Sequence, residues 1–209
     1  MIKALVFDMG GVLFDLDLNK GIKEFREKTG YESIKEAFDP YHPKGIVGEM
    51  ESGRISADEF LQICVSHSRP GTTPDTVREC FLSIVGDLEP EKAALIKELH
   101  GKYDLYLLSN NNPLALKYCG DMMEAAGIAI ESTFKKAFIS CQMHVSKPQP
   151  QIFQRAICEI GCPPEQILFI DDSIVNVNAA IAEGMNAVQY IQGSDLRALV
   201  EAELRKLSA

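Results

Sequence analysis

Apolar and polar residues follow one pattern over the second half of this chain. From residue 90 onward, short apolar runs alternate with longer segments in which apolar residues recur every three or four positions. The apolar runs, together with one near the start of the chain, predict strands over residues 4–7, 105–108, 137–140, 167–170 and 187–190. The periodic segments predict helices over residues 93–100, from 113 onward, and over 150–160, 175–182 and 194–207. This alternation predicts an α/β fold built on a doubly wound parallel sheet.

The segment between the first predicted strand and residue 88 has a different pattern. From about residue 18 onward its apolar residues recur at helical spacing between breakers, without the alternation of a strand. Asn19 is placed to cap a helix that Gly30 would end, and Ser56 and Glu59 have the spacing of a capping box. The sequence therefore predicts an α-helical insert, residues 15–88, within a core domain made of residues 1–14 and 89–209.

Composition narrows the kind of protein further. The chain has 209 residues, 46% of them hydrophobic, so it can bury a core without disulfides or metals. Its formal net charge of -9 disfavours binding to nucleic acids or anionic membranes. Its six cysteines are scattered, and no apolar run approaches a secretion signal or a membrane span. We therefore expect a cytoplasmic protein that binds neither nucleic acid nor membrane.

Asp8 is the first residue that points to chemistry. It ends the apolar run of residues 4–7 and precedes Gly10 and Gly11, so its carboxylate is expected at the carboxyl edge of a strand. Ligands bind at that edge in open α/β sheets, and an aspartate there can act as a nucleophile that forms an acyl phosphate. An aspartate that only begins a turn would have the same neighbours. The residues at the other predicted strand ends distinguish a nucleophile from a turn residue.

Three further polar clusters follow predicted strands or lie in the loops leading from them. They are Ser109 with Asn110, Lys147, and the pair Asp171 and Asp172. Right-handed crossovers bring the carboxyl ends of neighbouring strands together, so these groups are expected to converge on Asp8. Ser109 and the backbone N–H of Asn110 can donate to an anionic oxygen, and Lys147 places a positive charge beside it. Together the clusters indicate a site rather than four unrelated polar turns.

The predicted carboxylates also indicate a metal. Asp171 and Asp172 would face Asp8, and three carboxylates repel one another unless a cation lies between them. Mg²⁺ suits such a site because it prefers carboxylate, carbonyl, water and phosphate oxygens. The ion would also allow two anions, Asp8 and a phosphate, to approach each other for in-line attack.

These motifs, in this order, resemble those of the haloacid dehalogenase-like hydrolase superfamily. The resemblance rests on Asp8, Ser109, Lys147 and the pair Asp171 and Asp172, and the helical insert lies where members of the superfamily carry a cap. It implies a Rossmann-like core and a role for Asp8 as phosphoryl acceptor. Ser109 and Lys147 would bind the phosphoryl group, and Asp172 would bind Mg²⁺ with Asp171 beside it.

One position departs from the superfamily's pattern. Most of its phosphatases carry a second aspartate two residues after the nucleophile, which protonates the leaving alcohol and gives its carbonyl to the metal. Here that position is Gly10. The carbonyl stays a predicted metal ligand, whereas the acid is missing. Loss of a positioned acid costs about 10²- to 10⁴-fold for poor leaving groups and less for good ones, which favours anomeric sugar phosphates.

The chain also resembles a subgroup of bacterial sugar-phosphate phosphatases that act on α-glucose 1-phosphate. Residues 8–12 match its D-x-G-[GN]-V opening, and residues 51–56 are similar as well. Asp15 is expected either to contact the leaving group of the substrate or only to fix the turn into the cap. His144 is a further candidate for proton transfer.

The sequence thus predicts a Mg²⁺-dependent phosphomonoester hydrolase that acts on a small phosphate ester, with a sugar phosphate as the expected substrate. Two alternatives stay open. In a 2-haloacid dehalogenase the same aspartate attacks carbon without a metal, but the pair Asp171 and Asp172 argues against this. In a binding protein, a phosphorylated metabolite is held without turnover because the acid is lost at Gly10.

Overall fold

A five-stranded parallel sheet lies at the centre of the computed structural model, which describes residues 1–37 and 45–208. The strands run in the order β5-β4-β1-β6-β7. They are β1 (Ala4–Phe7), β4 (Asp104–Ser109), β5 (Lys136–Ile139), β6 (Ile167–Asp171) and β7 (Asn186–Gln189). Each lies within one residue of its predicted bounds, and the predicted doubly wound α/β sheet is confirmed.

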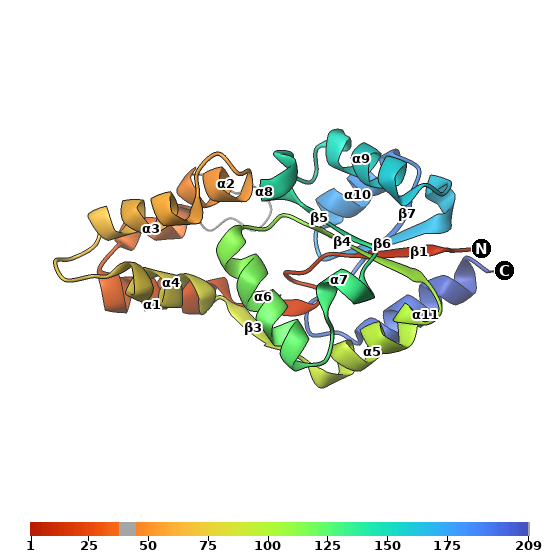
Figure 1. Ribbon diagram of the computed structural model, residues 1–209, viewed down its shortest axis with the longest axis horizontal. Helices are drawn as coiled ribbons and strands as arrows, with labels where there is room; N and C mark the ends of the chain where they lie inside the picture. The colour runs from red at the N-terminus through yellow and green to blue at the C-terminus, as the bar shows by residue number, and fades with distance from the viewer. Residues whose placement is uncertain (38–44, 209) are drawn as a thin grey trace.

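Helices cover both faces of this sheet (Figure 1). One face carries α5 (Pro90–His100), α6 (Pro113–Ala125), the short α7 (Ile130–Thr133) and α11 (Leu196–Lys206). The other carries the short α8 (Ser140–Met143), α9 (Pro150–Ile160), α10 (Ile174–Ala182) and the 3₁₀ segment η2 (Pro164–Gln166). Helices α5, α6 and α9 each begin with a proline. Proline is well suited to this position, because the backbone N–H that it lacks has no partner within the first turn of a helix. Among the described residues, no helix has the length and apolar character needed to cross a membrane.

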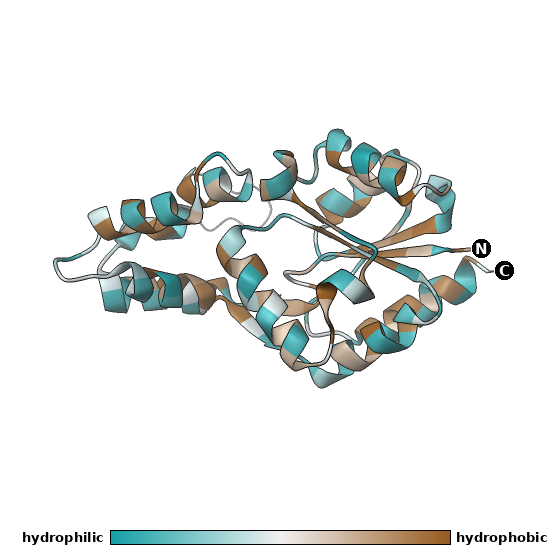
Figure 2. Ribbon diagram, viewed as in Figure 1, coloured by the Kyte–Doolittle hydropathy of each residue, from teal (hydrophilic) through white to brown (hydrophobic). Residues whose placement is uncertain are grey.

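The sheet is apolar on both sides, which explains why its strands were visible in the sequence. Leu5 and Phe7 of β1 join the core against α5, whereas Val6 joins the core against α9. Figure 2 shows the strands as a brown band between helices whose outward surfaces are teal. Strands buried on both faces read as nearly continuous apolar runs.

The insert forms a separate group of helices beside the core (Figure 1). Its elements are α1 (Leu18–Thr29), the 3₁₀ segment η1 (Glu32–Ala37), α2 (Gly45–Glu51), α3 (Ala57–Ser66) and α4 (Pro74–Leu82). They enclose their own apolar cluster, which includes Phe25, Met50 and Phe60. The predicted capping box of Ser56 and Glu59 is present at the start of α3.

Two details of the predicted insert are wrong. Helix α1 is capped by Asp17, whose Oδ1 accepts from the Lys20 N–H at 2.9 Å, and not by Asn19. The insert also contains a strand, because β3 (Val85–Leu88) pairs antiparallel with β2 (Phe14–Leu16). β3 has only two apolar residues and its pairing partner is distant in sequence, so no local pattern revealed it. The two strands form the connection through which the chain leaves the core and returns.

The sheet order identifies where a ligand is expected. From β1 the chain continues to β4 and β5 on one side, and then to β6 and β7 on the other. β1 is therefore the point at which the strand order reverses, and ligands bind beyond the carboxyl ends of strands at such a point. Asp8 directly follows β1.

Candidate active site

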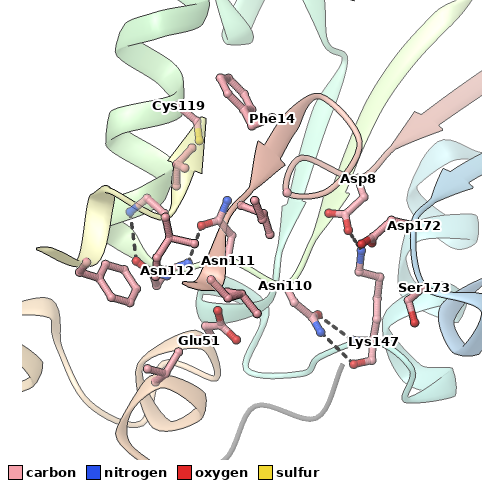
Figure 3. A pocket seen from close by; sticks show the side chains of 18 of the residues that line it. Asp8, Phe14, Glu51, Asn110, Asn111, Asn112, Cys119, Lys147, Asp172 and Ser173 are labelled. Carbon is pink, nitrogen blue, oxygen red and sulfur yellow. Dashed lines mark hydrogen bonds and ion pairs between the residues drawn. The ribbon is translucent and has the colours of Figure 1, made fainter. Parts of the chain in front are cut away.

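The polar residues predicted at the strand ends come together at the carboxyl edge of the sheet. Asp8 follows β1, Asn110 follows β4, Asp172 follows β6, and Lys147 lies in the loop between α8 and α9. All four line one cavity, which is closed on the other side by residues of the insert. Figure 3 shows Asp8, Asp172 and Lys147 grouped at one side of it.

Asp8 is held by the backbone around it. Its N–H donates to the Ile170 carbonyl at 3.0 Å, and its Oδ1 accepts from the Met9 N–H at 2.7 Å. Burial raises the pKa of Asp8 to about 7; Lys147 opposes this shift, and the neighbouring aspartates add to it. The carboxylate is therefore costly to ionise without further positive charge nearby.

Lys147 links Asp8 to Asp171. Its Nζ lies 2.8 Å from Asp8 Oδ2 and 2.6 Å from Asp171 Oδ2, and it donates to the Leu108 carbonyl at 2.9 Å. Burial alone would lower the pKa of Lys147, but the two carboxylates outweigh it and raise the pKa. An ammonium has three N–H groups, and these partners use all of them. Lys147 can thus offer a ligand a fixed charge, whereas a direct hydrogen bond would require it to release a partner.

The loop after β4 positions Lys147. The Asn110 side chain donates from Nδ2 to the Lys147 carbonyl at 2.9 Å and accepts at Oδ1 from the Lys147 N–H at 2.8 Å. Ser109 ends β4, is 1% exposed, and is not among the described residues that line the cavity. The structure therefore brings Asn110 to the cavity, whereas the phosphoryl contact of Ser109 stays a prediction.

Asp171 and Asp172 have different surroundings. Asp171 is fully buried, and its Oδ1 accepts from the Ser173 N–H at 2.8 Å and from Asn176 Nδ2 at 3.0 Å. Asp172 lines the cavity, and burial raises its pKa to about 6, with the charge of Asp171 adding to the shift. Gly11 faces it with φ +78°, and a Cβ there would lie 2.4 Å from Asp172 Oδ2. Only glycine allows this close approach.

The three carboxylates fit a divalent cation. Asp8, Asp171 and Asp172 each offer an oxygen within 4.8 Å of the others. A cation would relieve the repulsion that contributes to the raised pKa values of Asp8 and Asp172. The donors are hard oxygens, as Mg²⁺ requires, and Gly10 lines the same cavity. Because both oxygens of Asp171 already accept hydrogen bonds, Asp172 is the more available ligand of the pair.

Asp15 lies outside the cavity. It is the middle residue of β2, and its neighbours Phe14 and Leu16 line the cavity, so alternation turns Asp15 the other way. Its Oδ1 accepts from Lys92 Nζ at 2.7 Å, and Lys92 is 3% exposed. This geometry argues against the predicted contact with substrate and agrees with the alternative, in which Asp15 fixes the turn into the insert.

His144 also lies outside the described lining of the cavity. It is exposed, and its Nδ1 lies 3.3 Å from the Ser52 carbonyl. The contact joins the core loop after β5 to the turn that follows α2. His144 therefore belongs to the junction between core and insert, and it is not among the described residues that line the cavity.

Glu51 is a cavity residue to which the sequence alone assigned no role. It ends α2, and Figure 3 shows its side chain at the cavity on the side of the insert. Burial raises the pKa of Glu51 to about 8; the charge of Asp8 adds to the shift and that of Lys147 opposes it. The sequence marked this stretch only through the similarity of residues 51–56 to sugar-phosphate phosphatases, and that similarity assigns no chemical role to Glu51.

The rest of the cavity on the side of the insert is apolar. Its lining there consists of Leu16, Leu18, Val47, Phe81, Ile84 and Val85. These side chains come from β2, α1, α2, α4 and the approach to β3. The cavity thus has a charged end on the core and an apolar end on the insert.

Known proteins show the same architecture. The family described as haloacid dehalogenase-like hydrolase matches residues 2–184. A D-ribitol-5-phosphate phosphatase of Bacteroides thetaiotaomicron is 32% identical over 198 residues, which cover 94% of this chain and 96% of that protein. The sesquiterpene phosphatase astK of Aspergillus oryzae is 25% identical over 191 residues, covering 88% of this chain and 87% of that protein. A solved structure of similar fold is that of the HAD family enzyme bt-2542 of Bacteroides thetaiotaomicron, in complex with magnesium and inorganic phosphate. It matches with a TM-score of 0.86 and 30% identity, and the match covers 95% of this chain and 99% of that chain.

Proposed function

Because the chain belongs to the haloacid dehalogenase-like hydrolase family, we propose that it is a Mg²⁺-dependent phosphomonoester hydrolase that forms an aspartyl phosphate on Asp8. One observation carries the proposal. At the switch point of the sheet, the Asp8 carboxylate lies 2.8 Å from Lys147 Nζ and within 4.8 Å of oxygens of two further aspartates. A carboxylate among a fixed cation and metal-type ligands is suited to attack phosphorus.

The residues of the core divide the work of the reaction. Asp8 attacks phosphorus and becomes the acyl phosphate, while Lys147 stays beside it as a fixed positive charge. Asn110 holds the Lys147 loop in place through its two hydrogen bonds. Asp8, Asp172 and the Gly10 carbonyl would hold Mg²⁺, which would supply positive charge that offsets the phosphate and the attacking carboxylate.

The same site argues against attack on carbon. A haloacid has one carboxylate and a neutral reacting carbon, so its hydrolysis does not call for a cation between three acids. The gathering of Asp8, Asp171 and Asp172 would then only raise the cost of ionising the nucleophile. Phosphoryl transfer uses that arrangement, because both the substrate and the nucleophile are anionic.

We place a sugar phosphate or sugar-alcohol phosphate first among substrates. The resemblance of residues 8–12 and 51–56 to sugar-phosphate phosphatases and the similarity to a ribitol-5-phosphate phosphatase both support this choice. A second class, phosphate esters of apolar alcohols, is favoured by the apolar end of the cavity and by the similarity to a sesquiterpene phosphatase. The substrate is a small molecule in either case, and the cytoplasmic location stays a prediction from the sequence.

Release of inorganic phosphate from a panel of esters tests the proposal. The panel contains α-glucose 1-phosphate, D-ribitol 5-phosphate, a prenyl monophosphate and p-nitrophenyl phosphate, each with Mg²⁺ and with a chelator. We expect Mg²⁺-dependent release that Asp8→Asn abolishes. Release of chloride from 2-chloropropionate without phosphatase activity would identify a dehalogenase, and binding of esters without turnover would identify a binding protein.

A further inference from the structure

Hydrolysis of an alkyl phosphate requires a proton that Asp8 and Lys147 do not supply. The bond that breaks leaves an alkoxide, which must be protonated, and water must then lose a proton as it attacks the acyl phosphate. The described residues that line the cavity include five with titratable side chains: Asp8, Glu51, Cys119, Lys147 and Asp172. Within residues 1–37 and 45–208, these five are the candidates for the source of the proton.

Four of the five are unsuited to the task. Asp8 is the proposed nucleophile, Asp172 belongs to the carboxylate cluster, and Lys147 has no free N–H. Burial raises the pKa of the Cys119 thiol to about 12, too high for a donor that must also release its proton near neutral pH. Glu51 is the group that is left.

We propose that Glu51, brought to the cavity by helix α2 of the insert, donates the proton to the leaving alcohol and then accepts one from the attacking water. This inference rests on the proposed phosphatase function. It assigns to the insert a role in the reaction itself, in addition to the binding of the substrate.

The Glu51 side chain is free to act in this way. Within residues 1–37 and 45–208, no side chain or backbone group donates a hydrogen bond to its carboxylate or forms an ion pair with it. Glu49, on the same helix, is the opposite case, because Arg54 binds both of its oxygens, at 2.7 and 2.9 Å. α2 therefore carries one carboxylate that is paired at the surface and one that is unpaired at the cavity.

The backbone of Glu51 is anchored to the core. Its carbonyl accepts from Ser140 Oγ at 2.6 Å, and the same Oγ accepts from the Asn111 N–H at 3.0 Å. Gly53, in the turn after α2, has φ +70°, and a Cβ there would lie 2.3 Å from the Cys141 carbonyl. The end of α2 thus lies directly on the core segment that begins α8, and this contact fixes Glu51 beside the charged end of the cavity.

The electrostatic surroundings suit a donor. Among the described residues, the charged or titratable groups that face Glu51 are Asp8, Lys147 and Cys141. Burial and the charge of Asp8 raise its pKa to about 8, so Glu51 holds a proton near neutral pH. When Asp8 is phosphorylated, its carboxylate no longer carries the charge that raises the pKa of Glu51, while Lys147 continues to favour the ionised form of Glu51.

The proposed steps balance. In the first, an Asp8 oxygen forms a bond to phosphorus, the bond from phosphorus to the ester oxygen breaks, and the Glu51 proton passes to that oxygen to give the alcohol. In the second, water bonds to phosphorus, its proton passes to the Glu51 carboxylate, and the bond to Asp8 breaks. Phosphate is released with both carboxyl groups in their starting states.

Leaving-group dependence separates this role from a structural one. We would measure single turnovers, with enzyme in excess, on the alkyl ester that the wild type hydrolyses best and on p-nitrophenyl phosphate. Glu51→Gln is expected to slow cleavage of the alkyl ester by about 10²- to 10⁴-fold and to leave release of p-nitrophenolate nearly unchanged. With substrate in excess, the variant should show a burst of p-nitrophenolate, because water lacks its base. Glu49→Gln is the matched control and should behave as the wild type.

Each other outcome has a definite meaning. Equal losses on both esters, or no loss on the alkyl ester, would overturn the role of Glu51 while the Asp8-dependent phosphatase stands. A wild type that hydrolyses no ester, or an active Asp8→Asn variant, would instead refute the proposed function. If Glu51→Gln does not fold, the wild-type pH profile decides: single-turnover cleavage of the alkyl ester should fall above about pH 8, and release of p-nitrophenolate should not.

Discussion

The two ends of the cavity are built in different ways. The core end is charged, and its side chains are fixed by strand ends and by bonds to the backbone, as in the pairing of Asn110 with Lys147. The insert end is apolar and comes from helices and the β2–β3 connection. Between the two ends, α2 contributes Glu51, whose carboxylate has no partner among the described residues. Parallel strands hold the side chains at their ends rigidly, so the core suits the phosphoryl chemistry. Side chains on the helices of an insert can be replaced at little cost to the fold, so the insert suits the choice of leaving group.

Among variants that keep both Asp8 and Glu51, the largest expected effect is at the core end, in the positioning of Lys147. Asn110→Ala removes both hydrogen bonds that hold the Lys147 backbone, and misplacement of a catalytic charge by an ångström costs about 10²-fold in kcat. Asn186→Ala removes a similar bond, from Nδ2 to the Glu165 carbonyl at 2.7 Å, far from the cavity. Steady-state kinetics should show a loss of kcat for Asn110→Ala only. Equal kcat values for the two variants would show that the position of Lys147 does not depend on its hydrogen bonds to Asn110.

The core end was largely predictable from the sequence, for a physical reason. Asp8, Lys147 and the pair Asp171 and Asp172 follow apolar runs or the loops leading from them, and the rules of parallel sheets place such residues at one edge. Ser109 follows from the same rules, but it is buried and is not among the described residues that line the cavity, so its contact with the phosphoryl group stays a prediction.

The insert end could not be predicted in the same way. The alternation of β2, which turns Asp15 away from the cavity, depends on pairing with β3, a strand without a local signal. The approach of Glu51 depends on the contact of α2 with Ser140, which lies 89 residues further along the chain. Contacts of this kind arise from tertiary packing, on which hydrophobic periodicity carries no information.

The second effect concerns the cation at the core end. Asp8, Asp172 and Glu51 have pKa values of about 7, about 6 and about 8, above the ordinary 3.8 of aspartate and 4.5 of glutamate, so these groups bind more protons in the folded metal-free protein than in the unfolded chain. Their contribution to the free energy of unfolding should therefore be lost as pH rises from about 4 to about 8. Mg²⁺ at about 100 times its Kd at about pH 8 would restore about 2.7 kcal/mol, and the same concentration would restore less at about pH 5, because protons compete with the ion.

Thermal unfolding at the two pH values, with and without Mg²⁺, measures this difference. In Asp172→Asn the increase in Tm caused by Mg²⁺ should be much smaller than in the wild type. An increase that is the same at both pH values would show that the ion binds elsewhere.

A third effect sharpens the contrast at the insert end. Val47 lines the cavity from α2, so Val47→Ala enlarges the apolar end without altering any charged group. We expect KM values for prenyl and sugar phosphates to change relative to each other by up to about 10-fold, with kcat nearly unchanged. Val65→Ala, within the insert but away from the cavity lining, is the control. A large fall in kcat for Val47→Ala would mean that the two ends do not divide the work in this way.

The smallest effect on activity is expected at Asp15. Asp15→Asn leaves the buried Lys92 ammonium with Glu89, at 3.7 Å, as its remaining carboxylate partner, which should lower the free energy of unfolding by about 1–3 kcal/mol. Because Asp15 does not line the cavity, kcat and KM per folded molecule should stay at wild-type values. Denaturant unfolding and steady-state kinetics on the same preparation test both statements. A loss of kcat per folded molecule would instead indicate that Asp15 takes part in the reaction.

The most direct measurement is the location of the phosphoryl group during turnover. The enzyme would be quenched in acid while it hydrolyses the best ester of the panel in Mg²⁺, then digested and mapped by mass spectrometry. We predict one phosphoryl group on Asp8, in a peptide that stays unmodified in the Asp8→Asn variant. The Glu51→Gln variant is expected to accumulate this phosphorylated enzyme. Steady hydrolysis without phosphorylation of Asp8, in the wild type and in this variant, would contradict an aspartyl phosphate at this site.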